Sequence, residues 1–134
     1  MITPLLIGLV LTIGLIWVSR SITLDRDPAA YATTMIAIAL FYVVFAIEHG
    51  DRLTLIINVV LALVFIVGAL VGYVKSVRLI AFLLIGHGLF DATYHFAFHD
   101  HSPAPHWWAP FCFGVDFVLG FYLLWLEKTK PLKR

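Results

Sequence analysis

The chain has 134 residues, of which 62% are hydrophobic and 13% charged, and its mean hydropathy is +0.99. Soluble domains are nearer half apolar and a quarter charged, and a fold this small could not bury so much apolar surface. The composition therefore excludes a soluble enzyme, a nucleic-acid-binding protein and a disordered chain. Cys112 is the single cysteine, so an intrachain disulfide is excluded as well. An integral membrane protein of one domain remains, and the net charge of +1 gives no information about a charged partner.

Five apolar stretches are long enough to cross a bilayer as helices, which takes about 20 residues each. In chain order they cover residues 2–18, 31–47, 53–73, 78–98 and 107–126. The apolar runs are continuous rather than alternating, which argues against barrel strands. The first stretch lacks the basic start and the cleavage site of a signal peptide, so we expect it to be retained. We therefore predict an all-α bundle of five transmembrane helices.

Cationic residues indicate the orientation of this bundle, because Lys and Arg collect in cytoplasmic loops. Eight of them fall on one side, namely Arg20, Arg26, Lys75, Arg78, Lys128, Lys130, Lys133 and Arg134. Only Arg52 falls on the other side. We therefore expect the N-terminus outside the cytoplasm and the C-terminus inside it. No histidine then falls on the cytoplasmic side, so a histidine site would open outward.

The fourth stretch carries His87, Asp91 and His95 at four-residue spacing, which places them on one face of a helix. Ionisable groups inside a bilayer cost at least ~2.5–3.5 kcal/mol each, so they face the protein interior and find partners. Asp116, in the fifth stretch, falls by helical rise at a depth between His87 and Asp91. A short loop with two prolines joins the two stretches as antiparallel neighbours. We therefore expect Asp91 and Asp116 to meet.

Further candidates lie near the outer end of the bundle: Glu48, His49, His99, His101, His106 and Cys112. Cys112 stands one helical turn before Asp116, on the same face. Each of these residues has a simpler interpretation. Cys112 would be a small core residue, Glu48 an interfacial carboxylate beside Arg52, and the loop histidines solvated side chains.

Imidazole and carboxylate ligands suit Zn, Fe, Mn or Cu, whereas copper(I) prefers soft sulfur, and both methionines, Met1 and Met35, are predicted to lie far from this cluster. The sequence therefore predicts a divalent metal, Zn or Fe, held by His87, Asp91, His95 and Asp116. Two alternatives stay open. The same residues suit a proton or ion pathway, because histidine titrates near neutral pH, and they suit a structural network that holds helices together.

Two segments resemble a family of small, uncharacterised bacterial multi-spanning membrane proteins. The first runs from His87 through Gly88 and Asp91 to His95, and the second covers residues 105–116. The resemblance is confined to about the last third of the chain. Where that family has a pair of histidines, this chain has Tyr94 and His95. The resemblance implies the bacterial inner membrane and names no activity.

Seven-helix membrane hydrolases such as ceramidases and adiponectin-type receptors offer an analogy of site type, since they hold zinc with histidine and aspartate inside a bundle. Three functions follow from the cluster. A metal would activate water or polarise a carbonyl of a lipid or other apolar substrate, for hydrolase or oxidase chemistry. Alternatively the protein transports or handles protons or metal, or it is a structural subunit. A motif of Gly68 and Gly72 suits helix packing within one chain or in a homo-oligomer.

Overall fold

The computed structural model describes residues 2–97, 102–130 and 132, apart from the side chain of His95. These residues form α1 (Ile2–Ser21), the 3-10 helix η1 (Leu24–Arg26), α2 (Pro28–His49), α3 (Arg52–Lys75), α4 (Val77–Ala97) and α5 (Trp108–Thr129). The five α-helices are each long and apolar enough to span a membrane, and the described residues contain no strand. The predicted all-α, five-span membrane architecture is confirmed.

Local capping signals set the helix ends around α2. Pro28 is the first residue of α2, where its missing N–H costs nothing, and the Asp27 carboxylate accepts a hydrogen bond from the Ala29 N–H at 2.9 Å. Gly50 ends the helix at φ 77°, in the left-handed region that glycine adopts at no steric cost. Asp51 then caps α3 by accepting from the Thr54 N–H at 2.8 Å. The turn between α2 and α3 is therefore only two residues long.

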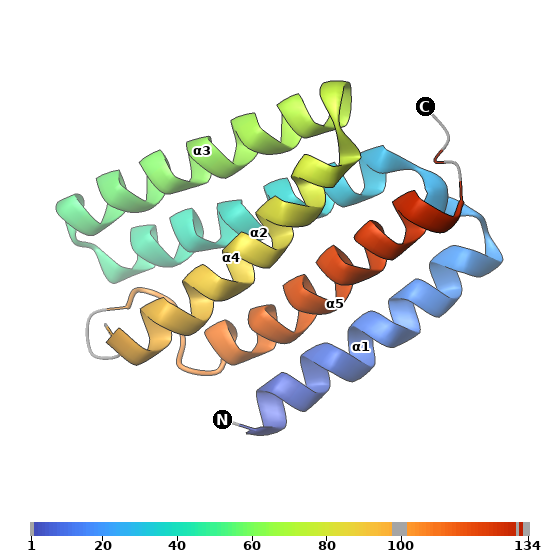
Figure 1. Cartoon of the computed structure of the whole chain (residues 1–134). Coiled ribbons are helices and arrows are strands. Elements are labelled where there is room, and N and C mark those ends of the chain that lie inside the picture. Colours follow the sequence, from blue (N-terminus) through green and yellow to red (C-terminus); the bar gives the residue numbers. More distant parts are fainter. Residues whose placement is uncertain (1, 98–101, 131, 133–134) are drawn as a thin grey trace.

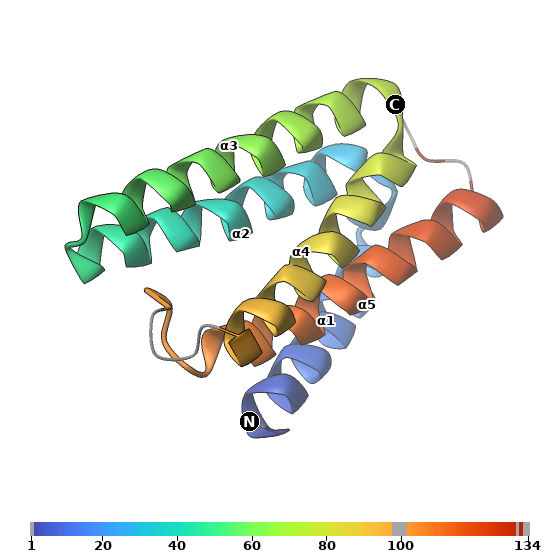
Figure 2. The same cartoon turned by 60° about the vertical axis from the view of Figure 1, so that its left-hand side comes forward.

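Consecutive helices run antiparallel (Figure 1), so the connections alternate between the two ends of the bundle. The helices α2 and α3 pair with each other, α4 joins this pair to α5, and α1 packs on the other side of α5. Figure 2 shows the α2–α3 pair splayed away from the layer of α4, α5 and α1. The position of α1 at the edge agrees with its lack of ionisable groups before Arg20. Arg20, Lys75 and Lys128 lie at one end of the bundle and Arg52 lies at the other.

Glycines allow close helix contacts. A Cβ on Gly68 would lie 2.8 Å from the Leu83 side chain, and one on Gly72 would lie 2.7 Å from Ile80. Both glycines therefore serve the contact between α3 and α4 inside one chain. A Cβ on Gly8 would lie 2.4 Å from the backbone oxygen of Phe111, so α1 can approach α5 closely only because this position lacks a side chain.

A buried carboxylate in η1 joins helices at the end of the bundle that holds Arg20. Asp25 is only 4% exposed, and its Oδ2 accepts a hydrogen bond from the Tyr122 hydroxyl at 2.7 Å. Its backbone oxygen accepts a second bond from the Tyr31 hydroxyl at 2.9 Å. Because Tyr31 lies in α2 and Tyr122 in α5, Asp25 holds the connection between α1 and α2 against both α2 and α5.

Candidate metal site inside the bundle

Three ionisable side chains meet in the interior of the bundle, on α4 and α5. His87 Nδ1 lies 2.8 Å from Asp116 Oδ2 and 3.4 Å from Asp91 Oδ2. His87 is 1% exposed, and Asp91 and Asp116 are 0% exposed. We call these three residues the triad. Its assembly agrees with the prediction that Asp91 and Asp116 meet near His87.

The close contact between α4 and α5 explains how the triad forms. A Cβ on Gly88 would lie 3.2 Å from the Cβ of Asp116, so the absence of a side chain there lets the two helix backbones approach. His87 and Asp91 are one helical turn apart, which points both side chains at the same level of α5. The triad is therefore a consequence of helical spacing on α4 and of a glycine beside Asp116.

A fourth residue, Tyr42 of α2, completes the polar network. Its hydroxyl donates a hydrogen bond to Asp91 Oδ1. Tyr42 is 4% exposed. The ring of Phe65, in α3, meets the His87 ring edge-to-face at 4.9 Å between centroids. Side chains from four helices thus surround the triad, and neither Tyr42 nor Phe65 was among the residues predicted from the sequence.

Two carboxylate oxygens of the triad have no hydrogen-bond partner. They are Asp91 Oδ2 and Asp116 Oδ1, and both are buried. Burying a polar oxygen without a partner costs about 1–3 kcal/mol, so native structures rarely leave one without a reason. A proton, a cation or the O–H of a water molecule can partner such an oxygen. Both unpartnered oxygens belong to the same small cluster, which points to a ligand shared between them.

The ligand set fits a metal ion. One ligand atom from each of His87, Asp91 and Asp116 can be chosen so that all three lie within 4.8 Å of one another. Two ligands about 2.1 Å from a tetrahedral zinc lie roughly 3.4 Å apart, which is close to the separation between His87 and Asp91. Two carboxylates and a neutral imidazole also balance the charge of a divalent cation. Among the described residues, no other three possible metal ligands lie this close together.

The other predicted residues fall in different places. Glu48 and His49 are exposed at the end of α2, and His106 is exposed before α5, so none of these three joins the triad. Cys112 is 2% exposed and packs with Tyr42, Ala104 and Trp108, outside the metal-ligand group. The side chain of His95 and residues His99 and His101 lie outside the described residues.

Two cavities lie against α4, one on the side of α2 and α3 and the other on the side of α1 and α5. The smaller one, about 10 Å³, lies beside His87 and Tyr42 and is bordered by Asn58 and Phe65 of α3. It has space for about one water molecule. Asn58 is 2% exposed and donates its amide to the Thr54 carbonyl at 2.8 Å. The triad itself is buried, and this space beside His87 is small.

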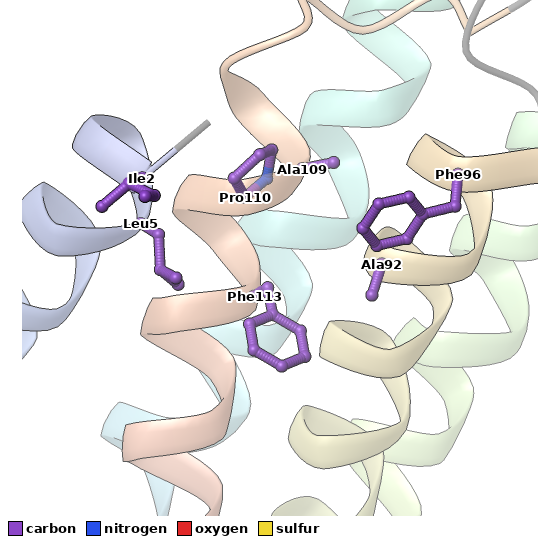
Figure 3. Close-up of a pocket in the computed structure, with 7 residues that line it drawn as sticks. All are labelled: Ile2, Leu5, Ala92, Phe96, Ala109, Pro110 and Phe113. Atoms are coloured by element: carbon purple, nitrogen blue, oxygen red, sulfur yellow. The ribbon is translucent and has the colours of Figure 1, made fainter.

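The larger of these two cavities, about 210 Å³, lies between α1, α4 and α5 near the start of α1 (Figure 3). Its walls are entirely apolar, and they consist of Ile2, Leu5, Ala92, Phe96, Ala109, Pro110 and Phe113. Ala92 follows Asp91 directly in α4. The cavity therefore adjoins the chain segment that carries the triad without exposing the triad's polar atoms.

The fold and the triad together define a multi-pass membrane helix bundle with a buried His–Asp–Asp cluster. Compared with known protein families, curated proteins and solved structures, the chain matches none of them. What this bundle does must therefore be argued from the site itself.

Proposed function

We propose that the protein binds one divalent metal ion, Zn or Fe, inside the membrane through His87, Asp91 and Asp116. The observation that carries this proposal is the pair of unpartnered carboxylate oxygens on Asp91 and Asp116, two fully buried residues that both lie against His87 Nδ1. Nitrogen and oxygen ligands of this kind are typical of Zn and Fe sites. His95 is a fourth ligand candidate from the sequence, one helical turn beyond Asp91.

Charge balance supports a divalent ion over a proton. An imidazolium between two carboxylates leaves one net negative charge in the interior, and buried charges are costly unless they are compensated. A divalent cation with a neutral imidazole removes that charge. It also supplies a partner to both unpartnered oxygens.

For the chemistry of the bound metal, we propose lipid-directed hydrolase or oxidase activity. Three protein ligands leave a coordination position for water or substrate, as catalytic zinc sites do. A metal bound there would be a Lewis acid and would lower the pKa of a bound water. The apolar cavity between α1, α4 and α5 supports a substrate with a hydrocarbon chain, because its walls carry no polar group.

A second candidate is proton handling, and the continuous contact from Tyr42 through Asp91 and His87 to Asp116 favours it. A pathway across the membrane needs further groups toward the inner end. Between His87 and Arg78, however, α4 contains only apolar residues and glycine. In α5 the next ionisable side chain after Asp116 is Tyr122, almost two helical turns away. Transport is therefore the weaker proposal.

We also propose that the N-terminus lies outside the cytoplasm and that the bundle resides in the bacterial inner membrane. The orientation is supported by the cationic residues at the end of the bundle that holds Arg20, Lys75 and Lys128. The membrane is supported by the resemblance of residues 87–95 and 105–116 to small bacterial membrane proteins. A reporter fused after Arg134 should be active only if it functions in the cytoplasm.

Elemental analysis of the purified protein in detergent tests the metal proposal. We expect about one Zn or Fe per wild-type chain, and background levels in His87→Ala and Asp116→Asn. His49→Gln is the matched control, because this histidine is exposed at the end of α2, and it should keep the full complement of metal. Equal, negligible metal in the wild type and the triad variants, after growth with added Zn and Fe, would refute the proposal.

A further inference from the structure

We infer that Tyr42 is a positioning residue that fixes Asp91 as a ligand through one oxygen only. The inference rests on the proposed metal site and names a residue on a different helix that shapes it. Tyr42 lies in α2, whereas the three ligands lie in α4 and α5.

The hydrogen bond from Tyr42 divides the two oxygens of Asp91 between different partners. The phenol hydroxyl donates to Oδ1, which takes one lone pair of that oxygen and orients the carboxylate. Oδ2 has no hydrogen-bond partner and lies 3.4 Å from His87 Nδ1. In this orientation Oδ2 is the oxygen that faces a metal held beside His87. A ligating carboxylate commonly has its second oxygen held in this way by a neighbouring hydrogen-bond donor.

Packing prevents the phenol from swinging away. The Tyr42 ring meets Phe90 and His87 edge-to-face, each at 5.8 Å between centroids, and it meets Phe45 edge-to-face at 6.4 Å. These rings come from α2 and α4, so they hold Tyr42 from both sides of the helix contact. A donor locked by packing keeps its acceptor in one orientation, which is how supporting residues preorganise a metal site.

Asp116 has no equivalent donor. Its Oδ2 is 2.8 Å from His87 Nδ1, and its Oδ1 is buried without a partner. The two carboxylates therefore differ: Asp91 is held in one orientation by α2, and Asp116 is held only by its contact with His87. Loss of the Tyr42 hydroxyl should free Asp91 to rotate or to bind through both oxygens, which changes the number of ligand atoms around the metal.

The alternative is that Tyr42 only ties α2 to α4. Tyr122→Phe separates the two roles, because it removes another phenol-to-aspartate hydrogen bond, from Tyr122 to Asp25 at 2.7 Å, at the other end of the bundle. If the hydroxyls act only by joining helices, both Tyr→Phe variants lose stability and neither changes the metal site. If Tyr42 positions Asp91, only Tyr42→Phe alters the metal site.

The experiment is a titration of the full-length protein in detergent with Co²⁺, whose visible absorption reports coordination number, followed by competition with Zn²⁺. For Tyr42→Phe we expect metal affinity to fall by about 10–100-fold, as for the loss of other supporting hydrogen bonds at metal sites, together with a changed Co²⁺ spectrum. Tyr122→Phe should keep the wild-type affinity and spectrum. If Tyr42→Phe does not fold, 3,5-difluorotyrosine at position 42 keeps the ring and alters the hydrogen bond, and it should shift both readouts.

The outcomes separate the two claims. If the wild type binds Co²⁺ and Asp91→Asn does not, but Tyr42→Phe matches the wild type in affinity and spectrum, the positioning role is wrong and the metal site stands. Equal losses in Tyr42→Phe and Tyr122→Phe would likewise overturn the positioning role. If the wild type binds neither Co²⁺ nor Zn²⁺, the proposed function fails, and the role of Tyr42 fails with it.

Discussion

Among the described residues, two buried carboxylates accept a hydrogen bond from a tyrosine hydroxyl, and they differ in how many of their oxygens have a partner. Asp25 pairs with Tyr122 at the end of the bundle that holds Arg20, and Asp91 pairs with Tyr42 in the interior. Both carboxylates are almost fully buried, at 4% and 0% exposure. Among the described residues, Asp25 has no buried oxygen that lacks a partner, whereas Asp91 Oδ2 is buried and unpartnered.

The difference shows which of the two is a structural contact. Asp25 joins three segments of the chain, because Tyr122 binds its carboxylate and Tyr31 binds its backbone oxygen. Asp91 instead shares its surroundings with a second carboxylate, Asp116, and with only one imidazole. Such an excess of buried acceptors lowers stability unless a ligand compensates it. A cost of this kind is typical of functional sites.

The largest expected effect that tests this comparison is that two Asp→Asn variants change the free energy of unfolding in opposite directions. In metal-free protein, Asp116→Asn leaves His87 with one carboxylate, which balances its charge, so we expect the free energy of unfolding to rise by about 1–2 kcal/mol. Asp25→Asn replaces a charge-assisted hydrogen bond by a neutral one, so the same quantity should fall by about 1 kcal/mol. Unfolding by SDS in mixed micelles with a chelator present measures both variants.

A loss of stability in metal-free Asp116→Asn as large as that in Asp25→Asn would contradict this interpretation. The triad would then be a structural network of the same kind as the contact between Asp25 and Tyr122. With Zn²⁺ present, Asp25→Asn should become more stable than Asp116→Asn, because bound metal stabilises only a protein whose metal site is intact. At a metal concentration 1,000 times the dissociation constant, the gain for the wild type is about 4 kcal/mol.

Sequence reasoning located the triad because its signals are local to each helix. The spacing of His87 and Asp91 fixes their common face, and the short connection between α4 and α5 fixes the level of Asp116. Tyr42 was missed because its contact with Asp91 depends on the rotation of α2 against α4, which tertiary packing decides. One signal was available: Met35, Ala39, Tyr42 and Ala46 are buried at helical spacing, so Tyr42 lies on the inward face of α2.

Asp25 was missed for a different reason. It lies in η1, a single turn that follows Thr23 in the left-handed region at φ 61°. Threonine rarely adopts that conformation, so its sequence gives no turn signal. Glu48 and His49, in contrast, were plausible neighbours of the triad by depth alone. The structure leaves them exposed because α2 ends at Gly50 with its buried face occupied by Ala46.

A smaller effect should follow from two glycines of α4 that differ in their distance from the triad. Gly88→Ala places a Cβ 3.2 Å from Asp116 Cβ and 3.1 Å from the Phe117 ring, so Asp116 must shift by a few tenths of an ångström. We expect metal affinity to fall by up to about tenfold, equivalent to about 1.4 kcal/mol. Gly86→Ala is the matched control, because its Cβ would have no neighbour within 4 Å.

Both alanine variants share the same gain in helix propensity, so that gain cancels when the two are compared. Zn²⁺ competition against a chromophoric chelator measures the affinities. If Gly86→Ala weakens binding as much as Gly88→Ala, then the effect arises from α4 as a whole rather than from the contact with Asp116. The role assigned to Gly88 in assembling the triad would then be wrong.

The smallest expected effect concerns Asp51, whose carboxylate has hydrogen-bond partners, as that of Asp25 does, but is exposed to water. Asp51 caps α3 outside the predicted spans, and hydrogen bonds from the Thr54 hydroxyl at 2.6 Å and the Thr54 N–H at 2.8 Å hold the pKa of Asp51 below its ordinary value. A lowered pKa in the folded state means that the ionised carboxylate stabilises the fold. This contribution is complete above the ordinary pKa of about 3.9 and is lost as the pH falls through the lowered value.

Asp51→Asn isolates this contribution, because asparagine caps a helix about as well as aspartate but does not titrate in this range. We expect the two proteins to unfold at similar temperatures at pH 7. Below about pH 4 the wild type should lose more stability than the variant, since only the wild type loses a charged cap. A temperature difference between them that is the same at pH 7 and at pH 3 would show that the charge of Asp51 contributes nothing. Water compensates an exposed carboxylate whether or not it has a partner, so a small effect here is what separates Asp51 from the two buried pairs.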